Sequence, residues 1–236
     1  MAMLFAWFAH FYTSLGLVCA AIIAVLIVQS GDASFRLAFF WMMIATAIDA
    51  TDGWIARRAR VTEVLPQFDG RILDDLADVH QYVSLPLLLL WRAGVLPGAS
   101  AWLLVLPLLS SGYWWSQVNA KTADGFFLGF PCYWNIIVFY LYMLSPPIAV
   151  SAAVIVVFSI LTFVPTPYLY ATRGGPFSIL MNAGAIVWFA FLALALFGRE
   201  DLSKAGLWLS LIYPALYLGL SVRVAMRRAP VAASKG

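Results

Sequence analysis

Charged side chains are scarce in this sequence, and their scarcity excludes most classes of soluble protein. Only 11% of the 236 residues are Asp, Glu, Lys or Arg, whereas an average soluble domain carries about 25%. Hydrophobic residues make up 64% of the chain, and the mean hydropathy is +0.91. A water-soluble core of this size cannot bury so much apolar surface. The composition therefore excludes ordinary cytosolic enzymes and disordered regulators, and it indicates an integral membrane protein.

Cysteine is also rare, and the net charge is small. Cys19 and Cys132 lie in or beside apolar runs and are interpreted as small core residues, so a secreted disulfide scaffold is excluded. A formal net charge of +3 is too small to indicate nucleic-acid binding. The first apolar stretch lacks a basic flank and is longer than that of a cleavable signal peptide.

Long apolar runs, by contrast, are abundant. A bilayer core about 30 Å thick needs roughly 20 apolar residues in a helix, and the runs are continuous rather than alternating, which excludes a strand barrel. We therefore expect an all-α polytopic membrane protein with about eight transmembrane helices. One transmembrane catalytic domain would cover residues 1–226, and a basic cytoplasmic tail residues 227–236. The predicted spans are residues 8–28, 35–56, 72–91, 101–118, 133–144, 148–163, 177–197 and 207–222.

Loop charges support the number of spans and their orientation. With the N-terminus in the cytoplasm, eight spans place ten basic residues inside and four outside, as the positive-inside rule expects. Seven spans would place the C-terminal basic cluster outside. The fifth and sixth spans are separated only by residues 145–147, so they form either a tight hairpin, which we favour, or one broken span with a re-entrant part. Both termini are expected on the cytoplasmic side of the membrane.

Acidic residues are concentrated where the second and third predicted spans reach the cytoplasm. Asp49 and Asp52 are three residues apart, and Asp74 and Asp78 are four apart. Each spacing places two side chains on one helix face, so two adjacent helices would bring four carboxylates together. Their mutual repulsion calls for a positive charge, and oxygen ligands favour Mg²⁺ or Mn²⁺ over zinc. The pattern predicts a site for two divalent cations that leaves positions open for phosphate oxygens.

Small residues and one arginine accompany these acids. Gly53, Ala56 and Gly70 would allow a helix or a ligand to approach closely, and Arg57 is placed to clamp a phosphate. Asp75 lies off the acidic face and is expected to be either solvated or a neighbour of the ligands, but not itself a metal ligand. The alternative is a structural salt-bridge network, but surface pairing does not require acids at regular intervals on two helices.

This pattern resembles the signature of the CDP-alcohol phosphatidyltransferases, integral membrane enzymes that join an alcohol to a phosphatidyl group and release CMP. Residues 49–78 read Asp-x-x-Asp-Gly-x-x-Ala-Arg, twelve residues, then Gly-x-x-x-Asp-x-x-x-Asp. The spacer is longer than in most of the family and is similar to that of bacterial phosphatidylcholine synthases, as is the segment 121–135. The resemblance implies the fold of that family, CDP-diacylglycerol and choline as substrates, and membrane lipids as surroundings. A homodimer is a possible assembly.

The resemblance also implies roles for individual residues. Two divalent cations, Mn²⁺ or Mg²⁺, would be held by four acids, the last of which would also be the base that takes the proton of the alcohol. These ligands are Asp49, Asp52, Asp74 and Asp78, with Asp78 as the base. The CDP group would be lined by Asp52, Gly53, Ala56, Arg57, Gly70 and Asp74.

Choline itself requires a different kind of recognition. Its quaternary ammonium is attracted by ring faces, although most aromatic residues of this chain can equally serve in interfacial belts. Tyr82 lies one turn beyond Asp78 and is the first candidate, and Trp114 is the second. Lys121 and Arg173 are candidates for the lipid phosphate of the donor, but the positive-inside rule explains both equally well.

Two other functions remain open at this point. The same chemistry on serine, glycerol phosphate or inositol phosphate is the first, although a phosphorylated acceptor would need more basic residues near the acids. The second is a divalent-cation transporter, because intramembrane acids also mark ion pathways. A transporter would tend to place its acids near the midplane, with internal repeats and broken helices.

Overall fold

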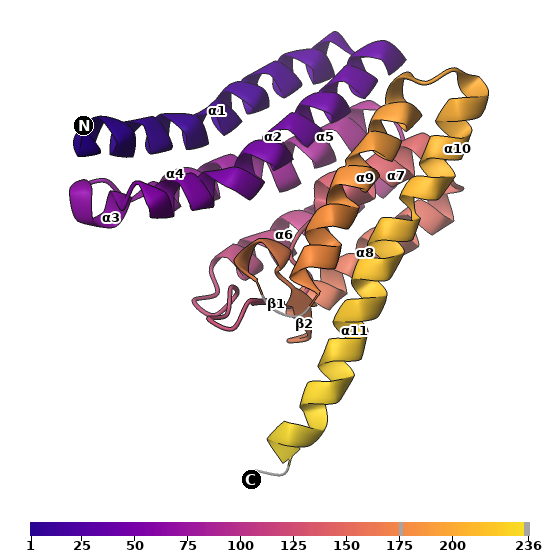
Figure 1. Cartoon of the computed structure of the whole chain (residues 1–236). Helices are drawn as coiled ribbons and strands as arrows, with labels where there is room; N and C mark the ends of the chain where they lie inside the picture. Colours follow the sequence, from indigo (N-terminus) through magenta and orange to yellow (C-terminus); the bar gives the residue numbers. More distant parts are fainter. Residues whose placement is uncertain (175–176, 234–236) are drawn as a thin grey trace. The chain divides into compact units, whose positions relative to one another are not determined.

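The structure is a computed structural model that describes residues 1–174 and 177–233, with side chains described as far as residue 227. Helices make up most of this part of the chain (Figure 1). The all-α prediction is confirmed, apart from one small two-stranded sheet. The helices are α1 (Ala2–Gln29), α2 (Asp32–Arg58), α3 (Val61–Val64), α4 (Gly70–Asp78), α5 (Leu85–Arg92), α6 (Val105–Trp115), α7 (Trp134–Leu144), α8 (Ile148–Phe163), α9 (Ser178–Phe197), α10 (Glu200–Ser210) and α11 (Ile212–Ala233), with the shorter turns η1 (Val79–Ser84), η2 (Gly98–Leu104) and η3 (Ala171–Arg173).

Four helices of the described chain are long and apolar enough to cross a membrane. They are α1, α2, α9 and the helix Glu200–Arg227 that α10 and α11 form together, while α7 and α8 are apolar but shorter. The protein is therefore a polytopic helical membrane protein, and the number of eight spans stays a prediction. α7 and α8 are separate helices, and the backbone between them turns at Ser145, which has a φ of 44°.

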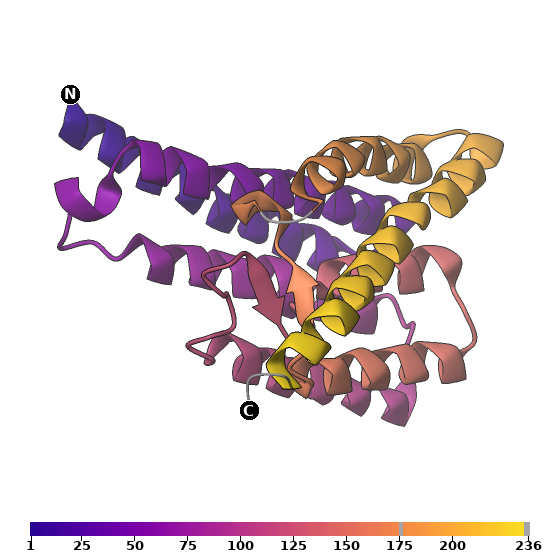
Figure 2. The same cartoon turned by 60° about the horizontal axis from the view of Figure 1, so that its bottom comes forward.

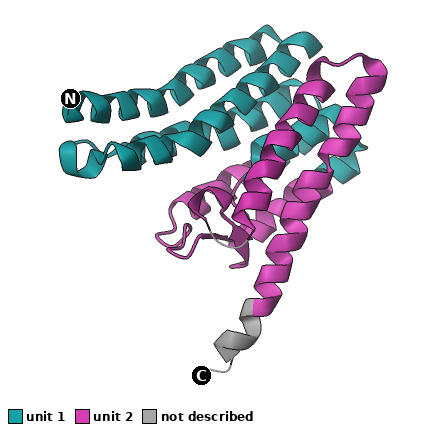
Figure 3. Cartoon of the chain, viewed as in Figure 1, with its two compact units in different colours: residues 1–104, 133–152 teal, residues 105–132, 153–236 magenta. Residues whose placement is uncertain are grey.

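The described chain forms two compact units, and each is built from two separate segments (Figure 3). Unit 1 comprises residues 1–104 and 133–152, and unit 2 comprises residues 105–132 and the chain from residue 153 onward. The extent of one catalytic domain over residues 1–226 stays a prediction. α11 continues as a helix into the predicted tail as far as Ala233, and residues 234–236 lie outside the described residues.

Within unit 1, α1 runs alongside α2 (Figure 1) and also packs against α4. Two glycines allow α1 to approach the third predicted span closely. A Cβ at Gly16 would lie 2.4 Å from Nε2 of Gln81, and a Cβ at Gly70 would lie 2.7 Å from Cε1 of His10. Each helix thus places a side chain where the other has a glycine, and this fixes their relative position along the axis.

The third predicted span, from Gly70 to Arg92, changes its winding in the middle. α4 is followed by the π-helical turn η1, and α5 continues to Arg92. Pro86 lacks the N–H that would bond back to residue 82 in an α-helix. The N–H of Leu85 bonds instead to the carbonyl of His80, five residues back. The π-turn therefore accommodates the proline, and it lies directly after Asp78.

In unit 2, two three-residue strands pair in antiparallel fashion. β1 (Phe126–Leu128) and β2 (Pro167–Leu169) lie side by side (Figure 2), with Phe126 opposite Leu169. Phe126 and Leu169 form a buried cluster with Met181 of α9. This sheet was not predicted, because strands of three residues show no measurable alternation in the sequence.

Candidate functional site

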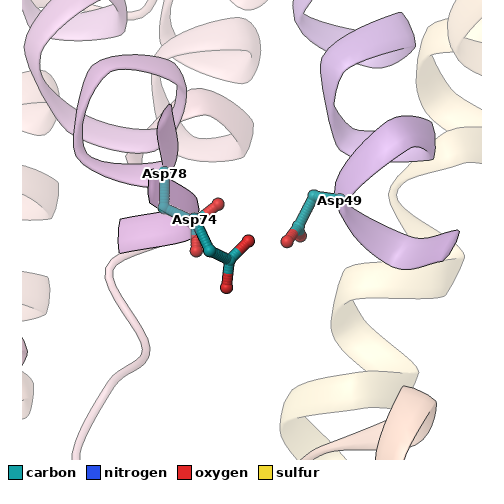
Figure 4. Close-up of side chains that lie close together, drawn as sticks. All are labelled: Asp49, Asp74 and Asp78. Atoms are coloured by element: carbon teal, nitrogen blue, oxygen red, sulfur yellow. The ribbon is translucent and has the colours of Figure 1, made fainter. Parts of the chain in front are cut away.

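Three acids from two helices of unit 1 converge on one point (Figure 4). Asp49 of α2 and Asp74 and Asp78 of α4 each offer a carboxylate oxygen, and these oxygens all lie within 4.8 Å of one another. The Asp49 side chain points from its own helix toward the other two (Figure 4). Asp78 is buried, and the other two are half-buried. Carboxylates this close in partly buried surroundings repel one another strongly, and their oxygens suit hard divalent cations such as Mg²⁺ or Mn²⁺.

Asp52 lies beside this group but does not belong to it. Its carboxyl group is buried, contacts the carboxyl group of Asp74 and accepts a hydrogen bond from the Thr13 hydroxyl of α1. Two carboxyl groups make such a contact only when a proton or a cation lies between them. The sequence predicted four acids at one point, whereas the structure brings three together and places the fourth next to them. Thr13 was missed, because nothing in the local pattern of α1 points to a partner on α2.

Asp69 determines where α4 begins. Its carboxylate accepts a hydrogen bond from the backbone N–H of Arg71 at 3.0 Å, as an N-cap residue does. The Arg71 guanidinium donates to the same carboxylate and holds the pKa of the Asp69 carboxyl below its usual range. With the start of the helix fixed, Asp74 and Asp78 follow on successive turns and face the same way.

The small motif residues lie on the last turns of α2 and at the start of α4. The Arg57 side chain folds back over Gly53, where a Cβ would lie 3.1 Å from Nη1 of Arg57. Gly53 therefore leaves room for the guanidinium, which is exposed at the end of the helix, and Ala56 is half-buried. Gly70 is covered by His10. Asp75 lies outside the group of converging carboxylates.

Tyr82 is linked directly to the acidic group. Its hydroxyl donates a hydrogen bond of 2.7 Å to Oδ2 of Asp49, and its side chain is 6% exposed. The ring packs against Tyr133, which precedes α7, at 6.0 Å between centroids and an angle of 54°. A candidate aromatic wall thus lies beside Asp49 within unit 1.

The remaining predicted residues belong to unit 2. Trp114 is buried, packs against Phe127 and donates its indole N–H to the carbonyl of Leu128 at 2.9 Å. Lys121 is exposed and pairs through its backbone with Phe127. Arg173 is exposed, and its guanidinium lies 5.8 Å from the centre of the Tyr170 ring. Their proposed roles toward choline and lipid phosphate stay predictions.

Known proteins resemble this chain over most of its length. A sequence model described as CDP-alcohol phosphatidyltransferase matches residues 6–164, which include the whole acidic motif. A phosphatidylcholine synthase of Legionella pneumophila is 35% identical over 92% of this chain and 87% of its own length. Those of Legionella bozemanae and Pseudomonas aeruginosa are 35% and 33% identical, over 79% and 78% of this chain and 90% and 76% of their own. On this match and these identities, the chain belongs to the CDP-alcohol phosphatidyltransferase family.

Proposed function

We propose that this protein transfers the phosphatidyl group of CDP-diacylglycerol to choline and so forms phosphatidylcholine and CMP. The observation that carries the proposal is the convergence of Asp49, Asp74 and Asp78 in a chain of this family. The relatives named phosphatidylcholine synthase, which align with most of the chain, support choline as the acceptor.

The residues present fit two divalent cations, Mn²⁺ or Mg²⁺. Asp49, Asp74 and Asp78 would hold them, and the adjacent Asp52 would complete the set, because its carboxyl already contacts Asp74. When bound, such cations neutralise the diphosphate, make its phosphorus more electrophilic and stabilise the departing CMP.

Asp78 would remove the proton from the choline hydroxyl. The choline oxygen then forms a bond to the phosphorus that carries diacylglycerol, and the bond from that phosphorus to the CMP oxygen breaks, so CMP leaves with the electron pair. A positioned base of this kind typically contributes about 100- to 10,000-fold to the rate. The burial of Asp78 at the end of α4 keeps competing water away from the proton transfer.

The donor, CDP-diacylglycerol, would lie along the last turns of α2 and the start of α4. The exposed Arg57 guanidinium, which lies over Gly53, can donate two parallel hydrogen bonds to phosphate oxygens, and the small side chain of Ala56 would let the nucleotide approach the backbone. The residues proposed to line the CDP group are Asp52, Gly53, Ala56, Arg57, Gly70 and Asp74. Lys121 and Arg173, which belong to unit 2, are proposed separately as residues that bind lipid phosphate.

The acceptor pocket would be formed by ring faces near the acids. Tyr82 and Tyr133 supply two adjacent rings, and each ring can contribute about 0.5–2 kcal/mol toward a quaternary ammonium, depending on how fully it is desolvated. Trp114, which belongs to unit 2, is a separate proposal for a choline contact.

Three arginines in and around the acidic motif have partners of their own. Arg60 pairs with Glu63, Arg71 pairs with Asp69, and the Arg58 guanidinium lies over the Trp54 ring. The sequence motif directs Arg57 to the diphosphate of the donor. These exposed ion pairs are individually weak, so the choice of acceptor rests on the relatives and not on the arginines.

The proposed setting is a bacterial inner membrane, with both termini and the acidic site on the cytoplasmic side and with a homodimer as the proposed assembly. The test uses purified protein with CDP-diacylglycerol, Mn²⁺ or Mg²⁺, and a panel of alcohols, and it measures CMP release and the lipid product. We expect CMP and phosphatidylcholine with choline. Release with serine and none with choline would overturn the choline assignment, while the membership of the family would stand.

A further inference from the structure

The hydrogen bond from Tyr82 to Asp49 joins the third predicted span to α2 at the acidic group. A buried phenol hydroxyl needs a hydrogen-bond partner, and here the partner is the carboxylate that α2 contributes to the three converging acids. Asp74 and Asp78 share one helix, so their relative position follows from helix geometry alone. The position of Asp49 relative to them depends on contacts between helices.

The local structure holds Tyr82 in place for this contact. The residue lies in the π-turn that Pro86 induces, and such turns occur frequently at functional sites. Its ring is buried and packs against Tyr133, so the hydroxyl has little freedom to move. A carboxylate that accepts one hydrogen bond on Oδ2 retains further lone pairs for a cation.

We infer that Tyr82 is a positioning residue for the metal site, whose hydroxyl orients the Asp49 carboxylate toward Asp74 and Asp78. The inference rests on the proposed function, since it takes these acids to be cation ligands. Partners that orient metal ligands typically change metal affinity or activity by about 10- to 100-fold when removed. The hydroxyl and the ring of Tyr82 then have separate roles, because the ring is proposed to face choline.

The substitution Tyr82→Phe separates the two roles, because it removes the hydroxyl and keeps the ring. Mn²⁺ binding to purified, chelator-treated protein in detergent can be followed by electron paramagnetic resonance of the free ion, without any turnover. We expect the Tyr82→Phe variant to bind Mn²⁺ about 10- to 100-fold more weakly. Its apparent constant for choline, measured at saturating Mn²⁺, should remain near that of the unaltered protein.

Tyr142→Phe is the matched control. The Tyr142 hydroxyl donates a hydrogen bond of 2.5 Å to Asp32 at the other end of α2, roughly 25 Å from Asp49 at a rise of 1.5 Å per residue. Both variants lose one tyrosine–aspartate hydrogen bond, and the loss of thermal stability should be smaller in Tyr142→Phe because Asp32 is exposed. Only Tyr82→Phe should weaken Mn²⁺ binding.

The possible results separate this inference from the proposed function. Equal Mn²⁺ affinity in the Tyr82→Phe variant and the unaltered protein would overturn the positioning role and leave the proposed function intact. Equally weakened Mn²⁺ binding in the Tyr82→Phe and Tyr142→Phe variants would also overturn the positioning role, since the effect would then reflect a general loss of structure. Failure of the unaltered protein to bind Mn²⁺ would overturn the inference and the proposed metal site together.

Discussion

Gln81 of η1 occupies the space beside Gly16 of α1, where a Cβ would lie only 2.4 Å from the Gln81 Nε2. The Gln81 side chain is 2% exposed, so it has little room to move aside. Ala77 lies on the other side of the same position, 3.3 Å from where the Cβ would be. A side chain at residue 16 would therefore have to displace the buried Gln81 amide or move α1 away from the span that carries Asp74 and Asp78.

Gly16→Ala should destabilise the protein, because an added methyl group in a closely packed interface typically costs about 1–3 kcal/mol. Thermal unfolding of the purified protein in detergent measures this effect. A second substitution, Gln81→Ala, should recover part of the loss, since it removes the atoms that the new methyl group meets. Gly112→Ala in α6 is the control, because a Cβ there meets no described atom within 4 Å; we expect it to be neutral or stabilising by about 0.5–1 kcal/mol. Similar melting temperatures of the Gly16→Ala and Gly112→Ala variants would contradict the close packing of α1 at Gly16.

Replacing any one of Asp49, Asp74 or Asp78 by Ala should reduce turnover to background. Each substitution removes an oxygen ligand from a group in which three carboxylates share their cations. Asp75→Ala is the matched control on the same helix, and its activity should fall far less. Treatment with a chelator should abolish CMP release, and added Mn²⁺ or Mg²⁺ should restore it. Full activity after complete removal of divalent cations would refute the proposed metal site.

Asp78→Asn tests the proposed base. The amide retains an oxygen that can still bind a cation, but it cannot accept the proton of choline at neutral pH. The maximal rate should therefore fall by about 100-fold or more, and the apparent constant for CDP-diacylglycerol should change much less. Steady-state kinetics at saturating metal distinguish the two quantities. If turnover remained near normal and only the metal constant rose, another group such as His80 or a water molecule would have to be the base.

Removing the proposed ring faces should weaken the binding of choline selectively. In Tyr82→Ala, Tyr133→Ala and Trp114→Ala variants, we expect a several-fold rise in the apparent choline constant with little change for CDP-diacylglycerol. Trp91→Ala is the control, because Trp91 is an exposed residue more than three helical turns beyond Asp78. If all four variants behave alike in choline kinetics, the choline pocket lies elsewhere.

The sequence predicted most accurately the features that depend on one helix alone, such as its extent and the side chains that share a face. The sixth predicted span, residues 148–163, coincides with α8, and Asp74 and Asp78 face one way because their spacing matches a helical turn. Contacts between helices were not predictable in the same manner. Thr13 meets Asp52 and His10 covers Gly70 only because α1 packs against α2 and α4.

The change of winding in the third predicted span does have a signal in the sequence. Pro86 lies inside an apolar run and marks the π-turn, since a proline there removes an α-helical hydrogen bond. The short strands had no such signal, because their pairing joins segments some forty residues apart. The placement of Trp114, Lys121 and Arg173 in a different compact unit from the acids likewise follows from long-range packing.

The interrupted course of unit 1 along the chain has a consequence for biosynthesis. All the motif acids have been synthesised once the chain reaches residue 78. α7, which packs against η1 and α5, is made only after residues 105–132 of unit 2. A fragment that stops at residue 104 would therefore contain every proposed ligand and lack Tyr133, which supports Tyr82. A truncated chain should therefore hold the three acids without one of the rings beside them, and during insertion into the membrane the surroundings of the acids are completed only when α7 has been made.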